Sequence, residues 1–286
     1  MQMSSILAAQ FAEKLLSKRA ITTLPIDPLA LAEAEAISVQ AKPESVAGVS
    51  GLLMRVGSNF GIMYATHIPN EGYQRFSVAH ELGHYFLPGH IDAIFSDDSK
   101  IHASHAGFVS DDRYEIEADH FAAGLLMPDP MFRNALLRAD DGLAGIEYLA
   151  SLCRTSLNAT AIRYIDKATI PAAVIVSKGT QIEYCLMSAA LKEFPDLRWL
   201  KKGFNLPKCS LTQKFNDTAD NVRNAARDEN SADLQDWFGG KRSLEVLEQV
   251  IGLGSYEKTL TVITCDTFAD EEDEDEHLRD SWSPHF

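Results

Sequence analysis

Two histidines and a glutamate in the segment H-E-L-G-H, residues 80–84, have the residue types and spacing to bind and use a metal ion. Residues 75–86 follow helical spacing, so His80 and His84 lie about 40° apart around a helix, with roughly 6 Å between their Cβ atoms. That separation lets both imidazoles reach one zinc ion at about 2.0–2.1 Å. Glu81 then lies beside the metal, where it can deprotonate a zinc-bound water and pass the proton to a leaving amine.

A catalytic zinc site needs a third protein ligand and an open position for water, and the sequence offers two candidates. His90 lies ten residues after His80, the spacing of the metzincin motif H-E-x-x-H-x-x-G-x-x-H. That motif has a glycine where this chain has Leu87, so the chain reversal is out of register. Glu115 lies in a second helical segment, with Asp119 one turn later on the same face. Glu115 could bind the metal while Asp119 accepts the outer N–H of a ligand histidine.

Other histidines and acids near these residues have a simpler interpretation. Glu117 lies about 200° around the helix from the candidate ligand, so we interpret it as a solvated charge. If His90 is not a ligand, we interpret it as a loop histidine. A second metal cluster is an alternative that irregular spacing disfavours; its members would be His102, His105 and His120.

Hydrophobic periodicity predicts the elements that position these side chains. A glycine-punctuated hairpin is expected over Val46–Ala65, and residues 88–112 are expected to form a loop. Asp27 is expected to cap a short helix that begins at Pro28. The remaining predicted helices cover 4–19, 72–87, Tyr114–Met127, 131–139 and 143–166. After Ile170, strands are expected at A-A-V-I-V-S, T-Q-I-E-Y-C-L and T-L-T-V-I-T-C.

Composition limits the classes of function. The formal net charge is −15, but residues 266–280 hold nine acids and one base and so carry −8 of it. No basic patch is visible, which makes nucleic-acid binding unlikely. No apolar run approaches the ~20 residues that span a membrane. The four cysteines are widely separated and no signal-peptide pattern is present, so we expect a cytoplasmic protein with reduced thiols.

Several ordered segments together resemble the ImmA/IrrE-type metallopeptidases. They are P-I-D-P-L-A-L-A-E, the hairpin, Q-R-F-S-V-A-H-E-L-G-H-Y-F-L, E-I-E-A-D-H-F-A-A-G-L-L-M-P and T-S-L-N-A-T-A-I-R-Y. The resemblance implies Zn²⁺ bound by His80, His84 and Glu115, with Glu81 as the catalytic base. Asp119 occupies the family's acidic or amide position four residues after the ligand glutamate, from which it would orient a ligand histidine.

The resemblance also implies a fold and a function. The expected fold class is α+β, with a zincin-like helical catalytic domain over 1–167 that contains a small β-hairpin or sheet. A mixed α+β C-terminal domain of unknown role follows over 168–265, and an acidic, flexible tail over 266–286. The implied function is that of a cytosolic zinc endopeptidase that cleaves a helix-turn-helix repressor in stress or mobile-element control.

Two further features leave alternatives open. The strand Phe60–Ala65 could be a sheet edge along which an extended substrate adds, or it could simply pack on the active helix. Residues 145–166 have a helix-turn-helix appearance, with Arg154, Asn158 and Arg163 available to DNA. The rival hypothesis is therefore a non-proteolytic regulatory or DNA-binding protein with a structural zinc.

Overall fold

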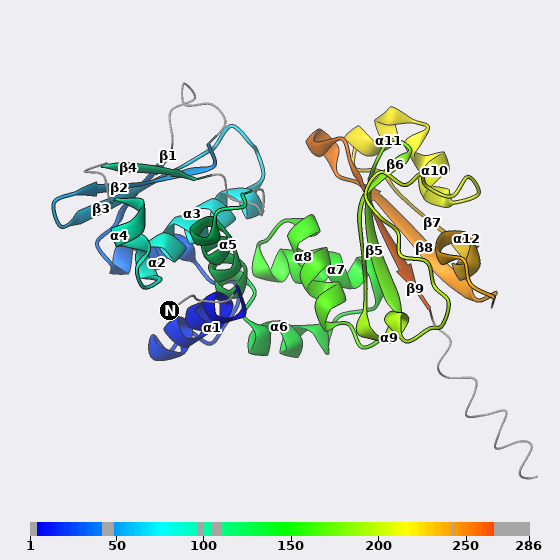
Figure 1. Cartoon of the computed structure of the whole chain (residues 1–286), viewed down its shortest axis with the longest axis horizontal. Coiled ribbons are helices and arrows are strands. Elements are labelled where there is room, and N and C mark those ends of the chain that lie inside the picture. Colours follow the sequence, from blue (N-terminus) through cyan, green and yellow to red (C-terminus); the bar gives the residue numbers. More distant parts are fainter. Residues whose placement is uncertain (1–4, 42–48, 96–99, 105–109, 242, 266–286) are drawn as a thin grey trace, which may run out of the picture. The chain divides into compact units, whose positions relative to one another are not determined.

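The computed structural model describes residues 5–41, 49–95, 100–104, 110–241 and 243–265, which form two compact units (Figure 1). One unit lies within residues 1–139 and 147–160, and the other within 140–146 and 161–286. A mainly helical part precedes a part in which strands and helices are mixed. This content confirms the predicted α+β fold class.

The division between the units falls inside two helices, α7 (Gly142–Cys153) and α8 (Leu157–Lys167). The sequence suggested a boundary after residue 167, at the change from helical to strand spacing. The roles expected of 1–167 and 168–265 remain predictions, and the acidic tail at 266–286 lies outside the described residues.

A four-stranded sheet in the first unit has the order β1-β3-β2-β4. Its strands are β1 (Ser38–Ala41), β2 (Gly51–Val56), β3 (Asn59–Tyr64) and β4 (Ile101–Ser104). β2 and β3 form the predicted hairpin, which pairs Gly51 with Tyr64 and Val56 with Asn59. β1 joins β3 in parallel, and β4 joins β2 in antiparallel orientation.

Of the two alternatives for the strand at Phe60–Ala65, the sheet edge is wrong, because β3 has a neighbour on each side. Among the described residues, the edges of this sheet are β1 and β4. The expected loop over 88–112 is also partly wrong, since it contains α4 (His90–Ile94) and β4. Elements of four or five residues are too short to show a hydrophobic period, so periodicity in the sequence could not predict them.

Helix α5 of the first unit packs against both α1 and α3, and the three helices contribute to its main apolar cluster. Besides α4, the helices that lie wholly within the first unit are α1 (Ser5–Lys18), α2 (Pro28–Ala34), α3 (Glu71–Phe86), α5 (Arg113–Leu126) and α6 (Asp129–Leu136). Asp27 caps α2 as predicted, accepting from the Leu29 backbone N–H. α1 and α5 approach closely at Gly124, where an added Cβ would lie 2.7 Å from the Cα of Ala9. This packing fixes the position of α5.

The second unit is built on an antiparallel five-stranded sheet with the order β6-β5-β9-β8-β7. Its strands are β5 (Ala172–Lys178), β6 (Gln181–Met187), β7 (Arg227–Asp233), β8 (Glu245–Gly252) and β9 (Thr259–Thr264). The short helices are α9 (Ala189–Lys192), α10 (Leu211–Asn216), α11 (Ala219–Arg223), α12 (Leu234–Phe238) and the 3-10 turn Gly254–Tyr256. Buried Glu248 ties α10 and α12 to the sheet by accepting from Thr212 and Trp237.

The four cysteines are free thiols, and those predicted to be buried, Cys185 and Cys265, are buried. Cys153 is buried as well, whereas Cys209 is exposed. Among the described helices, none has both the length and the apolar character needed to cross a membrane.

Candidate metal centre

Helix α3 carries His80, Glu81 and His84 on a face that is closed to solvent, each with 0% exposure. The helix begins where Asn70 accepts a hydrogen bond from the Tyr73 backbone N–H at 3.0 Å. It ends at the extended residue Leu87, immediately before a proline, which disfavours helical backbone at the preceding residue. These two signals place His80 inside the helix and His84 in its last turn.

Helix α5 brings Glu115 to the same point. Its first turn is capped by Asp112, which accepts from the Tyr114 backbone N–H at 2.8 Å. α5 crosses α3 closely at Gly83, where an added Cβ would lie 3.0 Å from the Cα of Ala118. Glycine at this crossing therefore lets the two helices approach until side chains from both can reach one ion.

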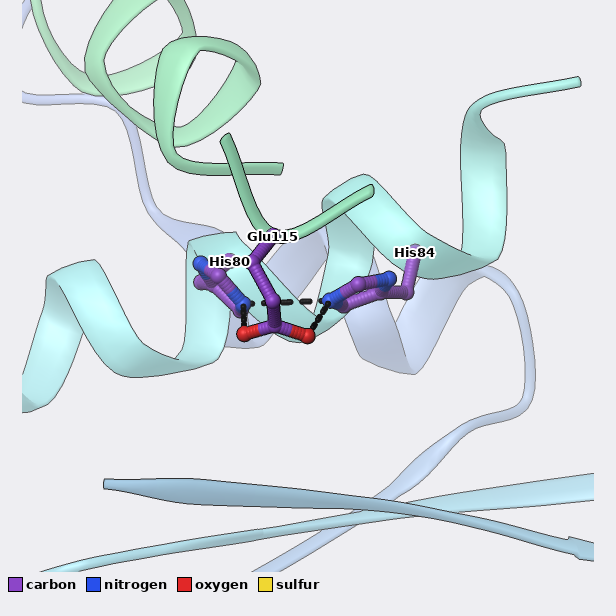
Figure 2. Close-up of side chains that lie close together, drawn as sticks. All are labelled: His80, His84 and Glu115. Atoms are coloured by element: carbon purple, nitrogen blue, oxygen red, sulfur yellow. Dashed lines mark hydrogen bonds and ion pairs between the residues drawn. The ribbon is translucent and has the colours of Figure 1, made fainter. Parts of the chain in front are cut away.

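The three predicted ligand residues converge in the structure (Figure 2). The Nε2 atoms of His80 and His84 lie 3.1 Å apart. The Glu115 carboxylate lies 3.3 Å from the first of these nitrogens and 3.2 Å from the second. Atoms that bind a tetrahedral zinc at about 2.0–2.1 Å are separated from one another by roughly 3.3–3.4 Å. The donor set and its spacing therefore fit a zinc ion.

The charges of these groups suit metal binding. Burial lowers the pKa of His84 to about 4, so its ring is neutral and can offer a lone pair. Burial would raise the pKa of Glu115, but hydrogen bonds from His102, His80 and His84 hold it well below its usual range. One oxygen of this buried carboxylate, Oε2, has only its 3.3 Å contact with Nε2 of His80 and no well-formed hydrogen bond among the described residues. A bound cation would compensate the charge of this buried oxygen.

Asp119 lies behind His80, with 2.8 Å between its Oδ1 and the ring Nδ1. Burial would lower the pKa of His80, but hydrogen bonds to Asp119 and Glu115 raise it to about 10. Without a metal this ring therefore carries a proton on both nitrogens at neutral pH. A metal ion would displace the proton on Nε2, which faces His84 and Glu115, while Nδ1–H continues to donate to Asp119. The carboxylate thus selects the tautomer that a metal ligand needs.

Glu81 lies next to this group and is not part of it. Its two carboxylate oxygens have no hydrogen-bond partner among the described residues. Burial raises its pKa to about 7, against the opposing charge of His80. A carboxylate with a pKa near neutrality can both take and return a proton at physiological pH.

Two interpretations of nearby side chains are wrong. His90 is not a loop histidine: it begins α4 and is fully buried. Glu117 is not a solvated charge, because it is 5% exposed and pairs with His90 at 3.0 Å. The helical wheel correctly separated Glu117 from Glu115, but it could not show that α4 covers the other side of α5.

His102, from the edge strand β4, was not recognised as part of this site. Its Nε2 lies 2.9 Å from Oε1 of Glu115, and its side chain is 20% exposed, unlike the other histidines here. Among the described residues, the only potential metal-binding group is His80, His84 and Glu115. The alternative second cluster stays a prediction, because one of its members is outside that part of the chain. His105 lies outside the described residues.

The segment with a helix-turn-helix appearance forms α7 and α8, and two of its three candidate DNA-contacting side chains meet acids. Arg154 pairs with Glu71 of α3, and Arg163 lies 3.9 Å from Asp166. These contacts favour packing within the protein over phosphate binding.

Comparison with known proteins supports the interpretation of this half of the chain as a peptidase-like domain. A family model described as the IrrE N-terminal-like domain, a peptidase family, matches residues 34–164. No curated protein matches the chain. Among solved structures, a transcriptional regulator from Mycobacterium tuberculosis is similar with a TM-score of 0.54 and 17% identity, covering 91% of this chain and 76% of that one. At this identity the similarity concerns the fold alone.

Proposed function

Residues 34–164 belong to the IrrE N-terminal-like family of peptidases, and on that premise we propose that the chain is a zinc-dependent endopeptidase. The observation that carries the proposal is the convergence of His80, His84 and Glu115, with the unpartnered carboxylate of Glu81 beside them. A bound zinc ion would polarise the scissile carbonyl and lower the pKa of the attacking water.

In this proposal the protein's own side chains transfer the protons and orient a metal ligand. Glu81 takes the proton from the attacking water and returns it to the leaving amine. Asp119 holds the His80 ring in the tautomer that presents Nε2, as its 2.8 Å contact with Nδ1 allows. The buried surroundings of Glu81 keep its pKa near neutrality, so neither proton transfer is strongly uphill.

We further propose that the substrate is a protein segment bound in extended form along β4. This strand is an edge of the sheet in the described part of the chain, and a sheet edge is the element along which an extended segment can add as a further strand. His102 on the same strand contacts Glu115, which connects that edge to the metal site. The substrate that the family resemblance favours is a flexible or locally unfolded region of a helix-turn-helix repressor. The resemblance also favours the cytosol as the place where cleavage occurs.

The proposal is tested by comparing protein N-termini in cells that produce the wild-type chain or the Glu81→Gln variant. The amide cannot accept the proton, so new N-termini should be present with the wild type and absent with the variant. The variant should still contain zinc, which shows that its site is intact. Identical N-termini in both cultures would contradict the proposal and favour the rival, a regulatory protein with a structural zinc.

A further inference from the structure

The second ring nitrogen of His84 faces another histidine. While Nε2 points to His80 and Glu115, the Nδ1 atom lies 3.2 Å from Nδ1 of His90. The Nε2 atom of His90 lies 3.0 Å from Oε2 of Glu117. A line of contacts therefore runs from His84 through His90 to a carboxylate on α5, and all three residues are buried.

One arrangement of protons satisfies every contact in this line. If His84 binds a metal through Nε2, its proton is on Nδ1 and needs an acceptor. Nδ1 of His90 can accept only when the His90 proton is on Nε2, and that N–H then donates to the Glu117 carboxylate. The carboxylate fixes the tautomer of His90, which in turn fixes the tautomer and ring angle of His84.

His90 is held in this position from several directions. It is the first residue of α4, and its ring meets the Tyr114 ring edge-on, with 5.0 Å between ring centres. The His84 ring lies 5.2 Å away on the other side. His90 therefore approaches His84 from behind, away from the point where the ligand atoms of His80 and Glu115 converge.

We propose that His90 and Glu117 are positioning residues for the metal ligand His84. Asp119 orients the His80 ring by a direct hydrogen bond, whereas Glu117 orients His84 through the intervening His90 ring. This inference rests on the proposed zinc site. Partners of this kind commonly change metal affinity by about 10–100-fold when they are removed. The alternative is a purely structural role, in which the His90–Glu117 pair only joins α4 to α5.

Two amide substitutions at residue 90 distinguish the positioning role from the purely structural role, because each replaces a different ring nitrogen. Asparagine can put its amide oxygen near the position of Nδ1, where it can accept from His84. Glutamine can reach the position of Nε2, where it can bond to Glu117 while leaving His84 without an acceptor. If positioning is the role, zinc affinity should be nearly retained in His90→Asn and should fall about 10–100-fold in His90→Gln.

The measurement is the zinc dissociation constant of the full chain, from competition with a chromophoric chelator, together with the visible spectrum of the cobalt-substituted protein. The melting temperature of each chelator-treated variant reports on folding separately. Glu117→Leu keeps much of the volume of the side chain but removes the acceptor, and it provides a second test. It should weaken zinc binding when it is the single change, but not further when His90→Gln is already present.

Equal zinc affinity in wild type, His90→Gln and Glu117→Leu would overturn the inference while leaving the zinc site itself in place. A loss in His90→Asn as large as in His90→Gln would overturn it as well. A wild-type chain that binds no zinc would instead contradict the proposed function, so the two failures are distinguishable.

Discussion

Gly51 leaves the space that the Glu81 carboxylate occupies: a Cβ added to this first residue of β2 would lie 2.3 Å from Oε1 of Glu81. The sheet and the active helix are therefore fitted to each other at the side chain proposed as the base. A strand residue with a side chain here would have to push the carboxylate away from its present position.

Gly51→Ala should lower the rate of substrate cleavage by about 100-fold, because a displacement of about 1 Å at a catalytic group can have that effect. Zinc content should be unchanged, since the three ligand side chains lie elsewhere. Cleavage is measured on a substrate identified from its new N-terminus.

Gly61→Ala is the matched control for that substitution. Gly61 lies in the neighbouring strand β3, and within the described residues its added Cβ would meet only the Met54 methyl at 3.3 Å and the Ser38 carbonyl at 3.5 Å. Full activity in Gly51→Ala, or an equal loss in the control, would show that the contact with Glu81 does not matter.

Asp119→Ala should weaken zinc binding by about 10–100-fold, because the His80 ring loses the acceptor that orients it. The dissociation constant is measured by chelator competition. Asp111→Ala, which removes an exposed carboxylate just before the same helix, should leave it unchanged. Equal dissociation constants for wild type and Asp119→Ala would rule out this role for Asp119.

Gly124→Ala should destabilise the first unit although alanine favours helix formation over glycine. The new methyl group would lie 2.7–2.9 Å from Ala9, including its backbone, so α1 and α5 would have to separate. Overpacking of this kind outweighs the gain in helix propensity, and we expect a net loss on the order of 1–2 kcal/mol in the free energy of unfolding. Denaturant titration checks this value, and an increase in stability would contradict it.

The long elements of the first unit were predictable because spacing carries the information. The i,i+4 pair His80 and His84 required a helix, and the acids of α5 lie on a strongly apolar helical background. The hairpin of β2 and β3 was marked by glycines between short apolar runs. Each signal is local, so no knowledge of the rest of the chain was needed.

The parts that could not be predicted depend on contacts between distant segments. His102 reaches Glu115 only because the four-residue strand β4 pairs with β2. His90 is buried because α4 lies against α5, and no periodic pattern shows that. In the second unit, β7 is polar and mostly exposed, so its place at the sheet edge had no signature in its sequence.

The central claim is that His80, His84 and Glu115 form a zinc site, and metal content tests it most directly. We predict one zinc per chain in wild-type protein purified with zinc in the medium, and a large loss in Glu115→Ala, whose histidines remain. Glu71→Ala, which removes an exposed carboxylate from the helix that carries both histidines, should keep its zinc. Equal zinc content in wild type and Glu115→Ala, or wild-type protein without zinc, would contradict the account.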